Sequence, residues 1–227
     1  MAEGETIRVW DPWVRLTHWA IVLLLPFSWW TAETARFDLH FLSGYTILTL
    51  VLFRIAWGLV GSETARFAAF LKGPGAALRH LAHLRERALP VEVGHNAAGG
   101  WMVLLLLLLL LAQATLGLFA DDDVLSTGPL ARRVSGATSA LASSVHVRVF
   151  WAIVACAVLH VAAVALYRAR GRNLVRPMVT GLLEVPAGER IAPPRLGSPA
   201  LALALLGASA GLVWWITTLR PAGGMFD

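Results

Sequence analysis

Seven histidines are the residues of this sequence best suited to bind a metal or a cofactor, and five of them lie at or within long apolar segments. The five are His18, His40, His95, His146 and His160. Fourteen residues separate His146 from His160, so a helix would place them on nearly one face, about 21 Å apart. For either one alone, a hydrogen bond to a neighbouring helix is an equally good explanation. Together they indicate two stacked sites that each use an imidazole, and haem iron held by paired histidines is the first candidate.

The composition is that of an integral membrane protein. Hydrophobic residues make up 57% of the 227 residues and charged residues only 15%, whereas a soluble domain is about one quarter charged. The net charge of +5 is better explained by cytoplasmic loops and anionic lipid headgroups than by nucleic acid. Cys156 is the single cysteine, which excludes an intrachain disulfide and a cysteine-ligated iron–sulfur cluster.

Apolar segments long enough to span a membrane occur five times, the first only marginally. They run from about Leu16 to Trp30, Leu39 to Val60, Gly99 to Phe119, residue 145 to 167, and Pro199 to Leu219. No convincing cleavage site follows the first segment, so we interpret it as an anchor. An N-terminus in the cytoplasm places thirteen Lys and Arg residues inside and four outside. The positive-inside rule therefore predicts a cytoplasmic N-terminus and a periplasmic C-terminus.

This orientation sorts the histidines by depth. His40 and His146 each begin a segment that descends from the outer face, whereas His18 and His160 lie toward the cytoplasm. The matched depths predict two bis-histidine haem sites, one near each face. A zinc or copper site is the alternative, but it would need three or four ligands at one depth, often with carboxylate or cysteine.

His95 precedes the third segment, and its role stays open among several. It could compete with His18 for the inner haem, contact a haem propionate or a quinone carbonyl, or cap the helix together with Asn96. Arg54 and Arg148 lie within spans and need counter-charges. We expect Arg54 to pair with a propionate, and Arg148 either to do the same or to reach the headgroups.

The loops suggest two surfaces. Residues 76–89 form a weakly amphipathic piece that we expect along the cytoplasmic surface, with His80 and His83 solvated at the lipid interface. Residues 120–144 form an outer loop that begins with Asp121, Asp122 and Asp123. This loop is long enough to bind a partner, although a solvated helix end explains the acidic triplet slightly better.

Several stretches resemble a known family, the bacterial di-haem cytochrome b-561 type, which is related to the membrane cytochrome b subunits of nickel–iron hydrogenases. They are VWDPWVRLTHW, LHFLSGYTILTLVLFRIAWGLVG, GHNAAGGW, GPLARRVS, VHVRVFWAIVACAVLH and NLVRPMVTG. The first, second and fifth contain His18, then His40 with Arg54, then His146 with His160. The resemblance covers roughly residues 7 to 181.

The resemblance implies an all-α transmembrane four-helix bundle with two b haems in residues 1–181. A linker and a fifth transmembrane helix, expected in residues 182–227 from the last apolar segment, lie outside this pattern, and the role of the fifth helix is open. It implies electron transfer in the bacterial inner membrane between the quinone pool and a periplasmic partner, such as a c-type cytochrome or a hydrogenase-like protein. Quinone reductase or quinol oxidase activity is left open. A non-redox membrane anchor for a soluble dehydrogenase or hydrogenase is the alternative function. A carrier of haem or small solutes would show broken helices and internal repeats, and neither is evident.

Overall fold

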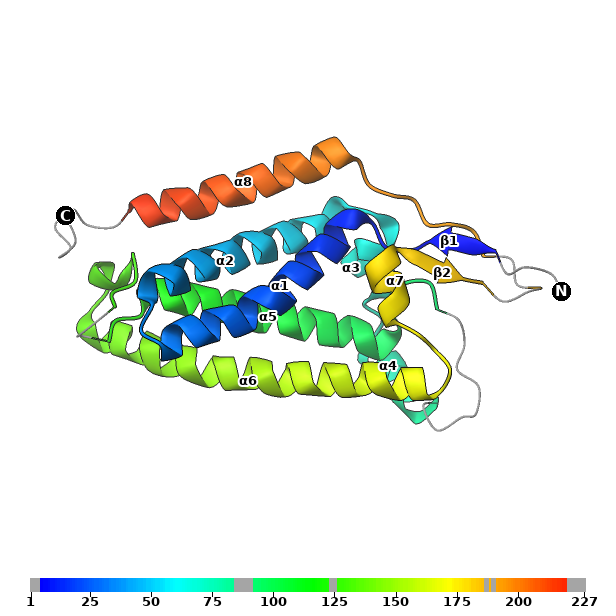
Figure 1. The fold of residues 1–227 in the computed structure, drawn as a ribbon, viewed down its shortest axis with the longest axis horizontal. Coiled ribbons are helices and arrows are strands. Elements are labelled where there is room, and N and C mark those ends of the chain that lie inside the picture. Colours follow the sequence, from blue (N-terminus) through cyan, green and yellow to red (C-terminus); the bar gives the residue numbers. More distant parts are fainter. Residues whose placement is uncertain (1–4, 84–91, 123–125, 186–187, 189–190, 220–227) are drawn as a thin grey trace. The chain divides into compact units, whose positions relative to one another are not determined.

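The fold is known from a computed structural model that describes residues 5–83, 92–122, 126–185, 188 and 191–219. In chain order its elements are β1 (Thr6–Arg8), α1 (Pro12–Glu33), α2 (Phe37–Val60), α3 (Phe67–Phe70), α4 (Pro74–His83), α5 (Ala97–Phe119), α6 (Gly136–Ala169), α7 (Val175–Thr180), β2 (Leu182–Glu184) and α8 (Pro199–Thr218) (Figure 1). The prediction of an all-α chain is confirmed, with one small antiparallel sheet of β1 and β2 added.

Four of the described helices are long and apolar enough to cross a membrane: α2, α5, α6 and α8. They correspond to the second to fifth predicted segments. The helix of the first segment, α1, has 22 residues but is not among the four. Arg15 and His18 lower its hydropathy near the start, and Pro26 interrupts its apolar run. These residues explain why the sequence predicts the first segment as only a marginal membrane span.

The described chain divides into two compact units. The first unit comprises the chain up to His18, Arg54–Leu106 and Cys156–Leu203. The second unit comprises Trp19–Phe53, Leu107–Ala155 and the chain from Ala204 onward. Each histidine pair predicted from matched depth therefore falls within a single unit.

In the first unit, Asp11 fixes the start of α1. Its Oδ1 accepts a hydrogen bond of 2.9 Å from the backbone N–H of Val14, as a helix-capping side chain does. Pro12 takes the first helical position, where its missing N–H is not needed. The Oδ2 atom accepts a hydrogen bond of 3.1 Å from the indole Nε1 of Trp57 on α2. Because Asp11 and Trp57 are both buried, this bond joins α1 to α2 in the interior of the unit.

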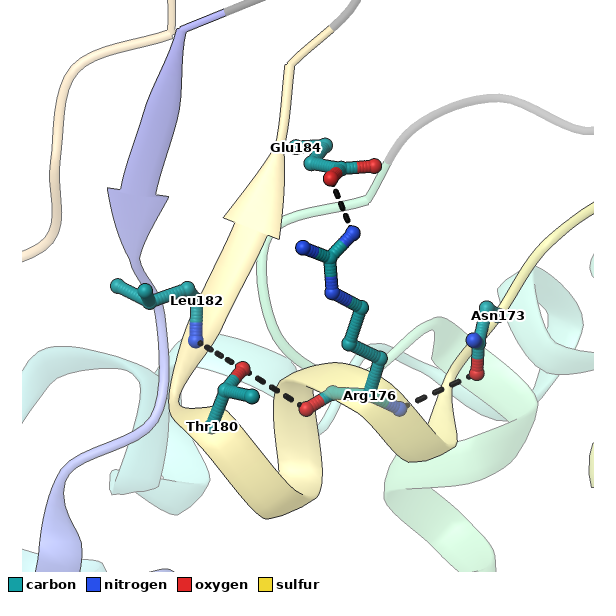
Figure 2. Close-up of polar contacts among 5 residues, drawn as sticks. All are labelled: Asn173, Arg176, Thr180, Leu182 and Glu184. Atoms are coloured by element: carbon teal, nitrogen blue, oxygen red, sulfur yellow. Dashed lines mark hydrogen bonds and ion pairs between the residues drawn. The ribbon is translucent and has the colours of Figure 1, made fainter.

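The stretch NLVRPMVTG forms α7 and the turn into β2, also in the first unit. Figure 2 shows the polar contacts that join them: Arg176 pairs with Glu184, and the backbone N–H of Arg176 donates to Asn173 Oδ1 at 3.1 Å. Gly181 follows α7 with a φ of +85°, a conformation that favours glycine. Its carbonyl accepts a hydrogen bond of 2.9 Å from the backbone N–H of Val9, so this stretch is attached to the N-terminal segment.

In the second unit, α8 packs against α2 and α5. Leu48, Leu118 and Val213, one from each helix, are buried together. The Arg133 guanidinium donates two hydrogen bonds, of 3.2 and 2.9 Å, to the carbonyl of Leu219 just after α8. The C-terminal helix is thus part of this unit's core.

The predicted outer loop of residues 120–144 is shorter in the structure, because α6 begins at Gly136. Ser135 caps this helix by accepting a hydrogen bond of 3.2 Å from the backbone N–H of Thr138. Asp122 Oδ1 accepts a hydrogen bond of 2.7 Å from the backbone N–H of Ser126, a contact within this loop. Asp123 lies outside the described residues.

The surface helix α4 covers the first part of the amphipathic piece predicted for residues 76–89, and residues 84–89 lie outside the described chain. His80 was expected to be solvated, but this is wrong. Its ring is partly buried and forms a hydrogen bond with Tyr167 on α6, a residue 87 positions away. The side chain of His83 lies outside the described residues.

Candidate functional site

Two histidines meet in the second unit. His40, in the first turn of α2, and His146, in α6, have ring centroids 6.3 Å apart, with an angle of 79° between the ring planes. An imidazole nitrogen lies about 2 Å from a metal that it binds, so two imidazoles on opposite sides of one ion have centroids roughly 6 Å apart. The observed spacing matches one metal ion between the two rings.

Backbone carbonyls orient both rings. The Nδ1 atom of His40 lies 2.9 Å from the carbonyl oxygen of Ser28 on α1, and Nδ1 of His146 lies 2.8 Å from that of Gln113 on α5. A carbonyl oxygen can only accept a hydrogen bond, so each Nδ1 carries the proton and donates it. The lone pair is then on Nε2 in both rings, which is the tautomer that a metal ligand needs. Such a bond from the other nitrogen also makes the ligand more basic.

A cavity in the second unit is lined by both histidines and by residues of α1, α2, α5 and α6. Its walls are mainly apolar and aromatic, including Trp29 and Phe150, whose rings are stacked. Gly44 lines the cavity one turn after His40, and a Cβ placed there would meet nothing within 4 Å. The cavity is thus an apolar space beside two imidazoles.

The donor set favours haem over a bare metal ion. Within the described part of the chain, no group of three or more His, Cys, Asp or Glu side chains could hold a metal. Zinc or copper would need three or four such ligands. Two axial imidazoles beside an apolar cavity instead fit an iron whose other four ligands come from a porphyrin.

The second predicted pair meets in the first unit. His18 on α1 and His160 on α6 have ring centroids 6.5 Å apart, with 56° between the planes. This spacing again suits one ion between two rings. Since α6 also carries His146, the same helix supplies one histidine to each pair.

His95 lies outside both pairs. Its ring packs between Trp10 and Phe70, with centroids 4.7 Å from each. Burial, followed by the charge of Arg54 and the nearby histidines, lowers the pKa of His95 from 6.5 to about 3, so the ring is neutral at physiological pH. Capping of α5 is performed by Asn96, whose Oδ1 accepts a hydrogen bond of 2.7 Å from a backbone N–H in the first turn. His95 contributes a neutral ring with a buried Nδ1 that has no hydrogen-bond partner among the described residues.

The two arginines proposed as propionate partners have different surroundings. Arg54 is buried, donates a hydrogen bond of 3.2 Å to the carbonyl of Ala65, and lies 5.7 Å from the ring centroid of Phe67. Arg148 is exposed and is not among the residues that line the cavity of the second unit. Contact of either arginine with a propionate stays a prediction.

Ser28 and Gln113 belong to the candidate site through their contacts with His40 and His146, and the sequence did not indicate them. Both orient a histidine through the backbone carbonyl. Because every residue has a backbone carbonyl, the residue type does not indicate such a contact. One signal in the sequence could have indicated Gln113, because it is a polar residue inside an apolar segment, two residues after the leucine run of α5. Its Nε2 lies 3.0 Å from Nε2 of His146, in addition to the contact through its carbonyl.

The comparison with protein families identifies the class. Residues 9–181 match the family model described as prokaryotic cytochrome b561. The chain therefore belongs to the prokaryotic cytochrome b561 family, and the expected relationship to the hydrogenase cytochrome b subunits is confirmed. It is a membrane protein of an electron-transfer family. A search of curated proteins and a search of solved structures gave no match.

Proposed function

We propose that this chain is a di-haem cytochrome b that transfers electrons across the bacterial inner membrane between a periplasmic redox partner and the quinone pool. His40 and His146 would hold one haem through its iron, and His18 and His160 would hold the other. The observation that carries the proposal is the ring spacing of 6.3 and 6.5 Å in the two predicted pairs. Each haem, when bound, supplies a one-electron ferric–ferrous couple.

The protein's own contribution is to orient the ligands and to exclude water. The carbonyls of Ser28 and Gln113 fix the tautomers of His40 and His146 and increase their basicity. More basic axial ligands stabilise the ferric state, which lowers the reduction potential. The apolar cavity walls would raise the reduction potential, because a medium of low dielectric constant disfavours the additional positive charge of the ferric state.

The proposed bundle consists of α1, α2, α5 and α6, with α8 as a fifth span. Although α1 is less apolar than the others, its 22 residues extend roughly 33 Å, enough for a hydrocarbon core of about 30 Å. It supplies His18, carries the carbonyl that orients His40, and lines the cavity of the second unit. We place α1 in the membrane for these reasons.

The positive-inside orientation places the N-terminus in the cytoplasm and the C-terminus in the periplasm, with His40 and His146 toward the periplasm. A periplasmic c-type cytochrome or hydrogenase-like protein would then dock near the loop before α6, where Asp121, Asp122 and Arg132 lie. Quinone would react at the haem of the other pair, and the chain would act as a quinone reductase or quinol oxidase according to the direction of flow.

The test is the haem content and the reduced-minus-oxidised spectrum of the purified chain. We expect sharp b-type bands and about two haems per chain, extractable without covalent attachment. A folded chain that binds no haem in membranes or in detergent would contradict the proposal and would leave the non-redox anchor function. A single haem would contradict the two-site arrangement.

A further inference from the structure

A chain of hydrogen-bonding groups in the first unit is separate from both histidine pairs. It joins three segments: His80 on α4, Glu92 and Asn96 before α5, and Tyr167 near the end of α6. His80 Nε2 lies 2.6 Å from the Tyr167 hydroxyl, and Asn96 Nδ2 donates a bond of 2.8 Å to that hydroxyl. On its other side, His80 Nδ1 lies 3.5 Å from Glu92 Oε1. The two nitrogens of one imidazole thus face two different ionisable groups.

The donors and acceptors in this network have one consistent direction. Asn96 can only donate to the Tyr167 oxygen through its NH₂ group, which leaves the phenolic proton to be donated to His80 Nε2. Nδ1 of His80 then carries the other proton and faces the carboxylate of Glu92. A carboxylate behind an imidazole stabilises the imidazolium, as it does in hydrolase triads. Glu92 thus faces the protonated nitrogen of His80, and a further proton would bind at Nε2 once the Tyr167 hydroxyl turns its own proton away and accepts instead.

The network runs from the surface toward the histidine pair of the same unit. The side chain of Glu92 is 30% exposed and that of His80 is 14% exposed, so protons from solvent can reach the carboxylate end. Tyr167 follows His160 by seven residues on α6, so the two lie on nearly one face, about 10 Å apart along the helix. The other end of the network thus lies about two turns of α6 from a histidine that would hold the inner haem.

We propose that Glu92, His80 and Tyr167 form the site that takes up a proton when the haem held by His18 and His160 is reduced. This inference rests on the proposed function. The bound haem would supply the one-electron couple, with a quinol or the other haem as the reductant. One proton from solvent would bind at Nε2 of His80, and the Tyr167 hydroxyl would then accept a hydrogen bond from the imidazolium. When a quinone oxidises the haem, the electron leaves and the proton is released, so that charge is balanced in each direction.

Among the ionisable groups around His80, the imidazole itself is the one that we expect to bind the proton. Glu92 and Tyr167 face the ring from the two neighbouring segments, Arg79 is its exposed neighbour on α4, and Arg168 follows Tyr167 on α6. Arginine keeps its charge at all relevant pH values, and imidazole is the side chain that ordinarily titrates between about pH 5 and 8. An electron added to the haem would strengthen proton binding at His80 through the attraction between the two charges.

The test is a redox titration of the purified, haem-loaded chain between pH 5.5 and 8.5, with dithionite, ferricyanide and mediators. We expect the midpoint potential of the inner haem, held by His18 and His160, to fall with rising pH by up to about 59 mV per pH unit, the limit for one proton bound per electron. In His80→Gln this dependence should be lost, because glutamine keeps an amide for hydrogen bonding but binds no proton. The outer haem in the same samples is the internal control and should show little dependence.

Further variants separate proton binding from a structural role. Arg79→Gln should shift the potential uniformly without changing its pH dependence. Glu92→Gln should move the pH-dependent range to lower pH, since the imidazolium loses its carboxylate; this variant decides the question if His80→Gln fails to fold. An inner haem whose pH dependence is the same in wild type, His80→Gln and Glu92→Gln would overturn the inference while leaving the di-haem function intact. Absence of haem would refute the proposed function itself.

Discussion

Gly117→Ala should weaken the binding of the haem held by His40 and His146. A Cβ at Gly117 would lie 3.1 Å from Cε1 and 3.4 Å from Nδ1 of His146. An ordinary carbon–carbon contact is about 3.5 Å or more, so the ring must move by about 0.4 Å. If the whole shift lengthens the bond of 2.8 Å to the Gln113 carbonyl, the new distance is about 3.2 Å, at the long end of the range for such bonds.

The expected cost is at most the loss of this hydrogen bond, which is worth about 0.5–1.5 kcal/mol. Haem binding should therefore weaken by up to about tenfold. This lies at the lower end of the effect of removing a partner that orients a metal ligand. The assay measures the rate at which the outer haem is transferred to excess apomyoglobin, together with the low-spin ferric EPR spectrum, which reports the orientation of the axial rings.

The matched control is Gly136→Ala, because a Cβ at Gly136 meets nothing within 4 Å and this residue does not line the cavity. We expect Gly117→Ala to accelerate haem loss and change the EPR spectrum, and Gly136→Ala to do neither. Wild-type transfer and spectrum in Gly117→Ala would refute the reasoning, as would equal changes in both variants.

Three further predictions follow from particular residues. Gly44→Leu should place a side chain in the cavity and prevent binding of the outer haem, held by His40 and His146, while the inner haem is retained. A pyridine haemochrome assay should then give about one haem per chain, and two haems per chain would contradict this prediction. The pKa of His95 is lowered from its ordinary value of 6.5 to about 3 in the folded chain. Below about pH 6.5 the unfolded chain therefore binds a proton that the folded chain does not bind, and the free energy of unfolding should fall as the pH drops. His95→Asn should keep both haems and reduce this loss by up to about 1.4 kcal/mol per pH unit, measured by thermal unfolding in detergent; an unchanged acid profile would count against it. Asp121→Asn combined with Asp122→Asn should slow reduction by a basic c-type cytochrome at low salt only, in stopped-flow measurements. Equal rates at every ionic strength would leave both residues with only their hydrogen bonds to Ser126 and Thr127 as a role.

The histidine pairs could be predicted because helix geometry and the positive-inside rule both act on sequence spacing. His146 and His160 lie on one helix, and depth alone matched each with a histidine on another segment. The start of α6 was misplaced because Gly136 to Ser144 is small and polar, a composition typical of loops as well as of exposed helix ends. Ser135 provides the cap that decides between these two structures.

The polar network around His80 could not be predicted for a different reason. Its partners, Glu92 and Tyr167, are 12 and 87 residues away along the chain, and the contact depends on how α4 packs against α6. An amphipathic pattern shows which face of a helix is polar, but it does not distinguish a solvated histidine from a hydrogen-bonded one. The contacts of the Ser28 and Gln113 carbonyls could not be predicted from the sequence either, because every residue has a backbone carbonyl.

The pairing of histidines across the two sites is tested most directly by four single variants and a haem spectrum of each. His40→Ala and His146→Ala should each lose the same haem, His18→Ala and His160→Ala should each lose the other, and every variant should retain about one haem per chain. The lost component should have the same absorption maximum and midpoint potential within each pair and differ between pairs. Loss of different haems by His40→Ala and His146→Ala, or retention of both haems in any of the four variants, would contradict the account.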